Sequence, residues 1–113
     1  MNSTNNVLAN YSFKESSDLL GIEEESFIRI FTKYINHFEE KFNLLKSLIK
    51  NNDYKSTTEL AHKLKGASGN LNLSCLSELF RTIELGAKEK KELTYTNELK
   101  KINLIYLELK KII

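Results

Sequence analysis

The sequence predicts an all-α fold: an up-down antiparallel four-helix bundle with a short additional helix at its N-terminal end. The chain has no proline and only four glycines among its 113 residues, and these two residue types break helices most strongly. Apolar residues recur at helical spacing in four longer segments, and no segment alternates as a strand would. The gaps between these segments are short, so sequential helices are expected to be antiparallel neighbours.

The first two helices are expected within residues 12–52. Ser12 and Glu15 have the spacing of a capping box, and Gly21 is a suitable end for the short helix that they begin. A long amphipathic helix follows. It begins at three glutamates, which suit a helix N-terminus, and ends near Asn51. Its inward residues are expected to be Phe27, Ile30, Phe31, Tyr34, Phe38, Phe42, Leu45, Leu48 and Ile49.

Three further helices are expected after residue 52. Asp53 is expected to cap the third helix and Ser74 the fourth. Gly86 stands near the end of the fourth helix, and the charged residues 87–93 connect it to the last one. The inward residues of the three helices are expected to be Tyr54, Leu60, Ala61, Leu64, Ala67 and Leu71; Leu76, Leu79, Phe80 and Ile83; and Tyr95, Leu99, Ile102, Tyr106, Leu109 and Ile113.

Length and composition exclude several classes of protein. The chain is long enough for one core, so we expect a flexible tail over residues 1–11 and a single bundle domain over 12–113, which can close its core as a monomer. The net charge of +2, from 17 basic and 15 acidic residues, gives no strong attraction to nucleic acid or anionic membrane. Cys75 is the single cysteine, so there is no disulfide framework. No signal peptide or membrane-spanning run is visible, and a cytoplasmic location is expected.

The stretch "ELAHKLKGASGNL", residues 59–71, places a histidine on the outer face of the third helix. At about 100° per residue, His62 lies about 160° from the centre of the apolar face. It should therefore point into water, which is not the position of a buried histidine whose hydrogen bonds are made within the core. An incidental surface histidine fits the helix pattern equally well.

Two glycines follow His62 on the same face. Gly66 and Gly69 lie within about 40° of it, and each removes a side chain although alanine would serve a helix better. An open strip beside the imidazole would let another protein approach closely. The alternative is that a glycine ends the helix as a C-cap; this fits Gly69 better than Gly66, after which Ala67, Ser68 and Leu71 continue the inward pattern.

Charged neighbours could support chemistry at His62. Lys65 follows by three residues and can bring an ammonium to an anion carried on the imidazole, although a generic solvated lysine is an alternative. Glu59 precedes by three and could accept a hydrogen bond from one ring nitrogen, leaving the other as nucleophile; water could do the same. Lys55, Glu59 and Gly69 are taken as the candidate partner face.

These residues resemble the signature of histidine-containing phosphotransfer (Hpt) domains of bacterial multistep phosphorelays. The segment "AHKLKGASGNL" matches that signature in register at His62, Leu64, Lys65, Gly66 and Leu71. The family often has glycine after this leucine, whereas this chain has Asn72. Asparagine is also suited to a left-handed turn, so the helix can still end there.

The resemblance implies a phosphorelay intermediate in a two-component system. The imidazole of His62 would take a phosphoryl group from a receiver-domain aspartyl phosphate and pass it to another receiver. Lys65 would balance the added charge, and Gly66 would allow the partner to approach. The implied partners are response-regulator receiver domains and a hybrid histidine kinase. The chain would need no cofactor of its own, because the receiver supplies Mg²⁺, and it would have no ATP-dependent kinase activity.

The sequence is compatible with other functions. The chain could be the phosphoacceptor domain detached from a chemotaxis-type histidine kinase, or a helical interaction module in which His62 carries no phosphate. Zinc binding is not expected, because two histidines and one cysteine at these spacings do not make a zinc set; His37 is expected at the flank of the second helix. DNA binding is not expected either, because no helix carries a basic stripe with base-reading partners.

Overall fold

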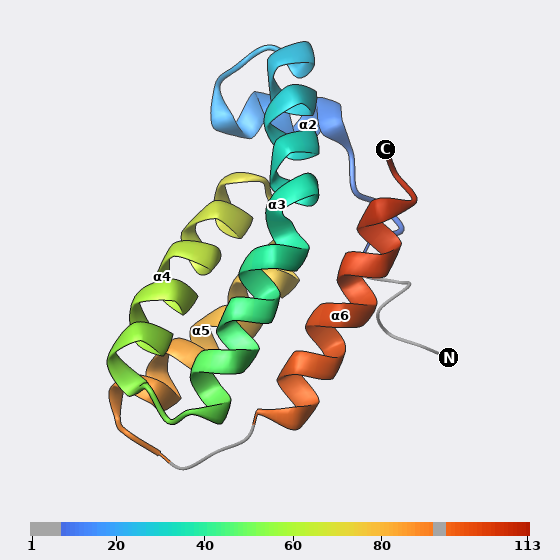
Figure 1. Ribbon diagram of the computed structural model, residues 1–113. Coiled ribbons are helices and arrows are strands. Elements are labelled where there is room, and N and C mark those ends of the chain that lie inside the picture. The colour runs from blue at the N-terminus through green and yellow to red at the C-terminus, as the bar shows by residue number, and fades with distance from the viewer. Residues whose placement is uncertain (1–7, 92–94) are drawn as a thin grey trace.

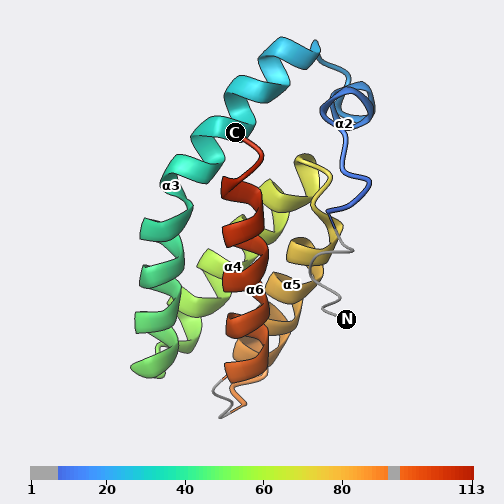
Figure 2. The same cartoon turned by 90° about the vertical axis from the view of Figure 1, so that its right-hand side faces the viewer.

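The computed structural model describes residues 8–91 and 95–113. It contains the helices α2 (Phe13–Leu20), α3 (Glu24–Lys50), α4 (Tyr54–Asn70), α5 (Ser74–Lys88) and α6 (Thr96–Lys110). Helices α3 to α6 run alternately down and up to form the bundle, and α2 lies across the end where α3 extends past its neighbours (Figures 1 and 2). The all-α bundle with a short extra helix is therefore confirmed.

The predicted helix ends are largely correct because they follow capping chemistry. The Ser12 side chain accepts from Glu15 N at 3.1 Å, and Gly21 ends α2 in the left-handed conformation with φ 79°. Asp53 accepts from Ser56 N at 3.1 Å and caps α4. Ser74 is not a cap. It is the first residue of α5, and Leu73 precedes it without a capping side-chain hydrogen bond.

The core is a column of aromatic and aliphatic side chains between the four long helices. The Phe38 ring stacks on Tyr106 of α6 at a centroid distance of 4.5 Å and also meets Phe80 of α5 at 6.3 Å. Two inward predictions are wrong. Ile30 is 48% exposed while Ile35 is buried, and Ile113 lies beyond the end of α6 with 50% of its surface exposed.

The segment before α2 packs against the bundle. Leu8 and Tyr11 contact the core, and the Tyr11 hydroxyl donates to the Leu71 carbonyl at 2.6 Å. Residues 8–11 thus belong with the folded unit rather than with the expected tail, of which residues 1–7 lie outside the described residues. Of the expected connection over 87–93, residues 87 and 88 belong to α5 and residues 92 and 93 lie outside the described residues as well.

Gly86 of α5 is fixed by packing. A Cβ atom at this position would overlap the hydroxyl and ring of the buried Tyr95, which precedes α6 with φ 55°. We therefore expect Gly86→Ala to lower the free energy of unfolding by about 1–3 kcal/mol, the usual cost of overpacking. The matched control is Gly66→Ala, whose Cβ meets nothing within 4 Å. Denaturant titration should show the control equal to or more stable than the parent; equal stability of both variants would contradict this account of Gly86.

Candidate functional site

His62 lies on the outward face of α4, as the helix pattern predicts. Its side chain is 65% exposed, while Ala61 and Leu64 beside it are buried in the core. The helix continues through Gly66 and Gly69 to Asn70, so neither glycine is a C-cap. The left-handed turn falls at Asn72, with φ 59°. His62 is therefore held on an unbroken helix with its imidazole in solvent.

The imidazole has a partner that the sequence did not reveal. Nδ1 of His62 lies 2.9 Å from Oε2 of Glu84, which comes from the neighbouring helix α5. Glu59, one possible acceptor considered from the sequence, is exposed on α4, and the residue in contact with Nδ1 is Glu84. The sequence places Glu84 and Ser77, seven residues apart, on one face of α5. The pairing of that face with His62 depends on how α4 and α5 pack together.

Glu84 also forms an ion pair with Lys65, the residue predicted to stabilise an anion carried on His62. Lys65 Nζ lies 2.8 Å from Oε1 of the same carboxylate. The Glu84 and Lys65 side chains are only 14% and 29% exposed, so solvent screens this pair less than a surface ion pair. The structure thus joins His62 and Lys65 through one carboxylate, with each oxygen facing one of them.

The protonation of this group follows from the charges around it. Burial acts to raise the pKa of Glu84, but the interactions with the neighbouring Lys65 and His62 outweigh that effect, and the pKa lies below its usual range. Glu84 is therefore ionised at neutral pH and can only accept hydrogen bonds. It follows that Nδ1 of a neutral His62 carries the proton and that the lone pair lies on Nε2.

The two glycines beside His62 have different surroundings. A Cβ at Gly66 would meet nothing within 4 Å, which agrees with an open strip next to the imidazole. A Cβ at Gly69 would lie 3.5 Å from Ser77 Oγ on α5, in ordinary contact. Gly69 therefore borders the seam between α4 and α5, so the open strip expected from the sequence is open at Gly66 and has a neighbouring helix at Gly69. Lys55 and Glu59 are exposed on α4 in the same row as His62.

An apolar groove of about 710 Å³ runs between α3 and α4. Lys63 and Ala67 line the groove from α4. In the sequence, Lys63 directly follows His62 and Ala67 directly follows Gly66. Ile30, the residue wrongly expected in the core, lines it from α3, together with the exposed His37. The exposed Ile30 therefore belongs to the apolar lining of a groove between α3 and α4.

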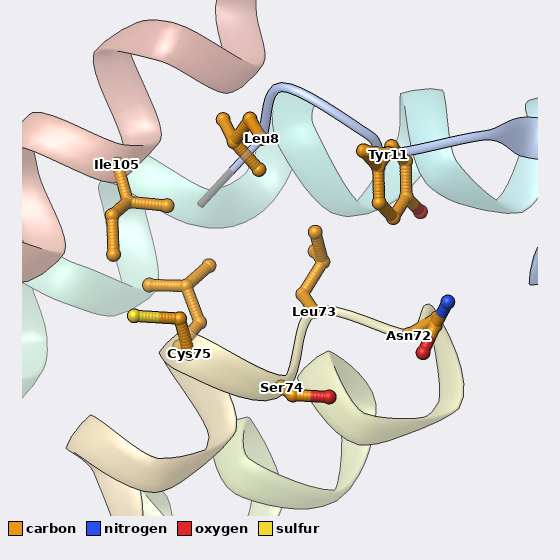
Figure 3. Close-up of a pocket in the computed structure, with 8 residues that line it drawn as sticks. Leu8, Tyr11, Asn72, Leu73, Ser74, Cys75 and Ile105 are labelled. Carbon is orange, nitrogen blue, oxygen red and sulfur yellow. The ribbon is translucent and has the colours of Figure 1, made fainter. Parts of the chain in front are cut away.

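A smaller hollow of about 260 Å³ lies at the junction of α4 and α5 (Figure 3). Leu8 and Tyr11 line it from the N-terminal segment and Cys75 from the start of α5. It contains none of the predicted site residues. In the described ranges 8–91 and 95–113, no group of three or more His, Cys, Asp or Glu side chains is placed to hold a metal ion.

None of the helices in the described part of the chain combines the length and apolar character that crossing a bilayer requires. No match was found among curated proteins or among solved structures. The family described as Hpt domain matches residues 29–109, which run from the first turns of α3 almost to the end of α6 and include His62, Lys65 and Glu84. Domains of this family carry out histidine phosphotransfer in two-component signalling and interact there with receiver domains and kinases. With most of its length matched, and with an exposed histidine on the bundle, the chain belongs to the Hpt domain family.

Proposed function

We propose that His62 accepts a phosphoryl group from the aspartyl phosphate of one receiver domain and passes it to another. The observation that carries this proposal is the exposed imidazole whose Nδ1 is bound to Glu84. That contact fixes the ring and leaves the Nε2 lone pair directed away from the carboxylate. An exposed nucleophile in a fixed position is the main requirement for phosphoryl transfer, which depends on positioning and charge stabilisation.

The proposed step balances without a further reactant. The Nε2 lone pair forms a bond to phosphorus while the bond from phosphorus to the aspartyl oxygen breaks, and the carboxylate of the receiver leaves with that electron pair. The ring keeps its proton on Nδ1, which continues to donate to Glu84 across the 2.9 Å contact, and it becomes an N-phosphorylated imidazolium. Transfer to the second receiver is the reverse reaction. Mg²⁺ belongs to the receiver's acidic site in this proposal.

Docking of the receiver is proposed over His62, Gly66 and the groove between α3 and α4. Gly66 leaves the approach to Nε2 open because no side chain stands there. The groove offers apolar surface between Ile30 and Ala67, and its charged lining residues are three lysines and one glutamate: Lys33, Lys41, Lys63 and Glu40. An apolar patch next to positive charges suits the rim of an acidic phosphorylation site on the partner.

Lys65 is proposed to balance charge on the phosphoryl group. Lys65→Met keeps the aliphatic stem and removes the ammonium. We expect transfer to His62 to slow roughly tenfold, the change that about 1.4 kcal/mol of lost charge stabilisation produces. The loss of stability, measured by thermal unfolding, should be smaller than this change in the barrier to transfer. Rapid-quench transfer from a phosphorylated receiver measures the rate, with Lys100→Met as the matched control, because Lys100 is exposed on α6 outside the site; an unchanged Lys65→Met rate would remove this role.

The proposed function is tested by phosphoryl transfer from receiver domains. Receiver domains from the organism that makes this chain are phosphorylated with radiolabelled acetyl phosphate and Mg²⁺. They are then separated from the acetyl phosphate and mixed with the chain. The proposal predicts label on the chain that is labile in acid and stable in base, and loss of that label to a second receiver. No label from any receiver of that organism would contradict it and favour a binding module.

A further inference from the structure

The Glu84 carboxylate does more than orient the imidazole, because it also occupies Lys65. One oxygen lies 2.9 Å from His62 Nδ1 and the other lies 2.8 Å from Lys65 Nζ. The ammonium that would stabilise a phosphoryl group is therefore already neutralised in the unphosphorylated protein. The Lys65 side chain is only 29% exposed, so it has less freedom than a surface lysine to move between two anions.

Phosphorylation of Nε2 changes the charges around this lysine. A phosphoryl group carries between one and two negative charges near neutral pH. Glu84 cannot leave when this group arrives, because it still accepts the hydrogen bond from Nδ1 and its side chain is only 14% exposed. Lys65 then lies between two anions, Glu84 and the phosphoryl group, that repel each other. The ammonium of Lys65 therefore stabilises each anion less than it would stabilise one anion alone.

We propose that Glu84 restrains Lys65 and thereby raises the free energy of the phosphorylated histidine, so that the equilibrium between His62 and a receiver is biased toward onward transfer. This inference rests on the proposed function. It assigns the direction of phosphoryl transfer to Glu84, a positioning residue on α5. A neutral residue of the same shape would orient the ring equally well. It would leave the whole charge of Lys65 to the phosphoryl group.

The geometry at Lys65 supports a restraint of this kind. The hydroxyl of Ser77 donates to the Lys65 carbonyl at 3.1 Å, so the backbone at Lys65 is tied to α5 as well. Glu84 and Ser77 come from the same helix, which fixes the carboxylate relative to both His62 and Lys65. In the described part of the chain, Lys65 and His62 are the only ion-pair partners of Glu84.

The test is the equilibrium of phosphoryl transfer in Glu84→Gln. The glutamine side-chain oxygen can still accept from Nδ1, but the negative charge is gone. We expect the equilibrium with the receiver that phosphorylates the parent to shift toward phosphorylated His62, by roughly three- to tenfold for loss of a nearby like charge in a partly screened site. The control is Glu78→Gln on the same helix, whose side chain is 72% exposed and which should cause no shift.

A double-mutant cycle separates charge restraint from ring orientation. If Glu84 restrains Lys65, then Lys65→Met should reduce the equilibrium constant for His62 phosphorylation more in the Glu84→Gln protein than in the parent. Equal effects, or an equilibrium in Glu84→Gln that is unchanged or shifted toward the receiver, would overturn the inference. The parent is phosphorylated in either case, so failure here is distinct from failure of the proposed function, in which the parent itself takes no label.

Discussion

His62→Gln is expected to abolish phosphoryl acceptance while the protein keeps its helical fold. The side chain is 65% exposed, so its replacement removes no core contact. The amide of glutamine approximates the size and hydrogen bonding of the ring but has no nucleophilic nitrogen. Label from a phosphorylated receiver should fall to background, and far-UV circular dichroism and the thermal midpoint should remain close to those of the parent.

His37→Gln is the matched control, because His37 is also exposed and lies on α3 in the groove. It should retain acid-labile label. Label that persists in His62→Gln and disappears in His37→Gln would show that the phosphoacceptor has been assigned to the wrong histidine. Loss of helical structure in His62→Gln would show that its side chain is not on the surface.

Gly66→Leu is expected to block the partner without harming the bundle. Space around a Cβ at this position is open in the free protein, and a helix interior favours leucine over glycine by up to about 1 kcal/mol. Stability should therefore be unchanged or higher. In the complex the same side chain would stand next to Nε2, where the receiver must approach, and we expect the transfer rate to fall at least tenfold, which corresponds to about 1.4 kcal/mol in the barrier.

Phosphoramidate, a small phosphodonor, distinguishes a docking defect from a chemical one. It needs no protein surface, so Gly66→Leu should accept phosphate from it at nearly the parent rate. Equal loss with both donors would mean that the leucine disturbs His62 itself. Normal transfer from the receiver would mean that Gly66 does not keep an approach open.

The fold was predictable because helix ends and inward faces are local properties of the chain. Ser12, Gly21 and Asp53 act at the termini as their side chains or backbone freedom dictate. Ile30 was misplaced because periodicity treats every apolar residue as inward. It does not recognise an apolar side chain that lies beside the buried stripe and lines a groove.

The candidate site was predictable only for its residues on α4. His62, Lys65 and Gly66 share one helix, so their relative positions follow from its geometry. Glu84 comes from 22 residues further along on another helix, and its contact with His62 depends on the packing of α4 against α5. The same packing brings Ser77 to Gly69. A single sequence contains the faces of both helices but not the register between them.

The measurement that tests the central claim most directly is the position of the phosphoryl group on the phosphorylated chain. The chain is labelled by a receiver and Mg²⁺ and examined by ¹H–³¹P correlation NMR, with peptide mapping under basic conditions. We predict a single phosphoryl group on residue 62, bonded to Nε2, since Glu84 holds Nδ1 at 2.9 Å. A phosphoryl group on Nδ1, or on any other residue, would contradict the account.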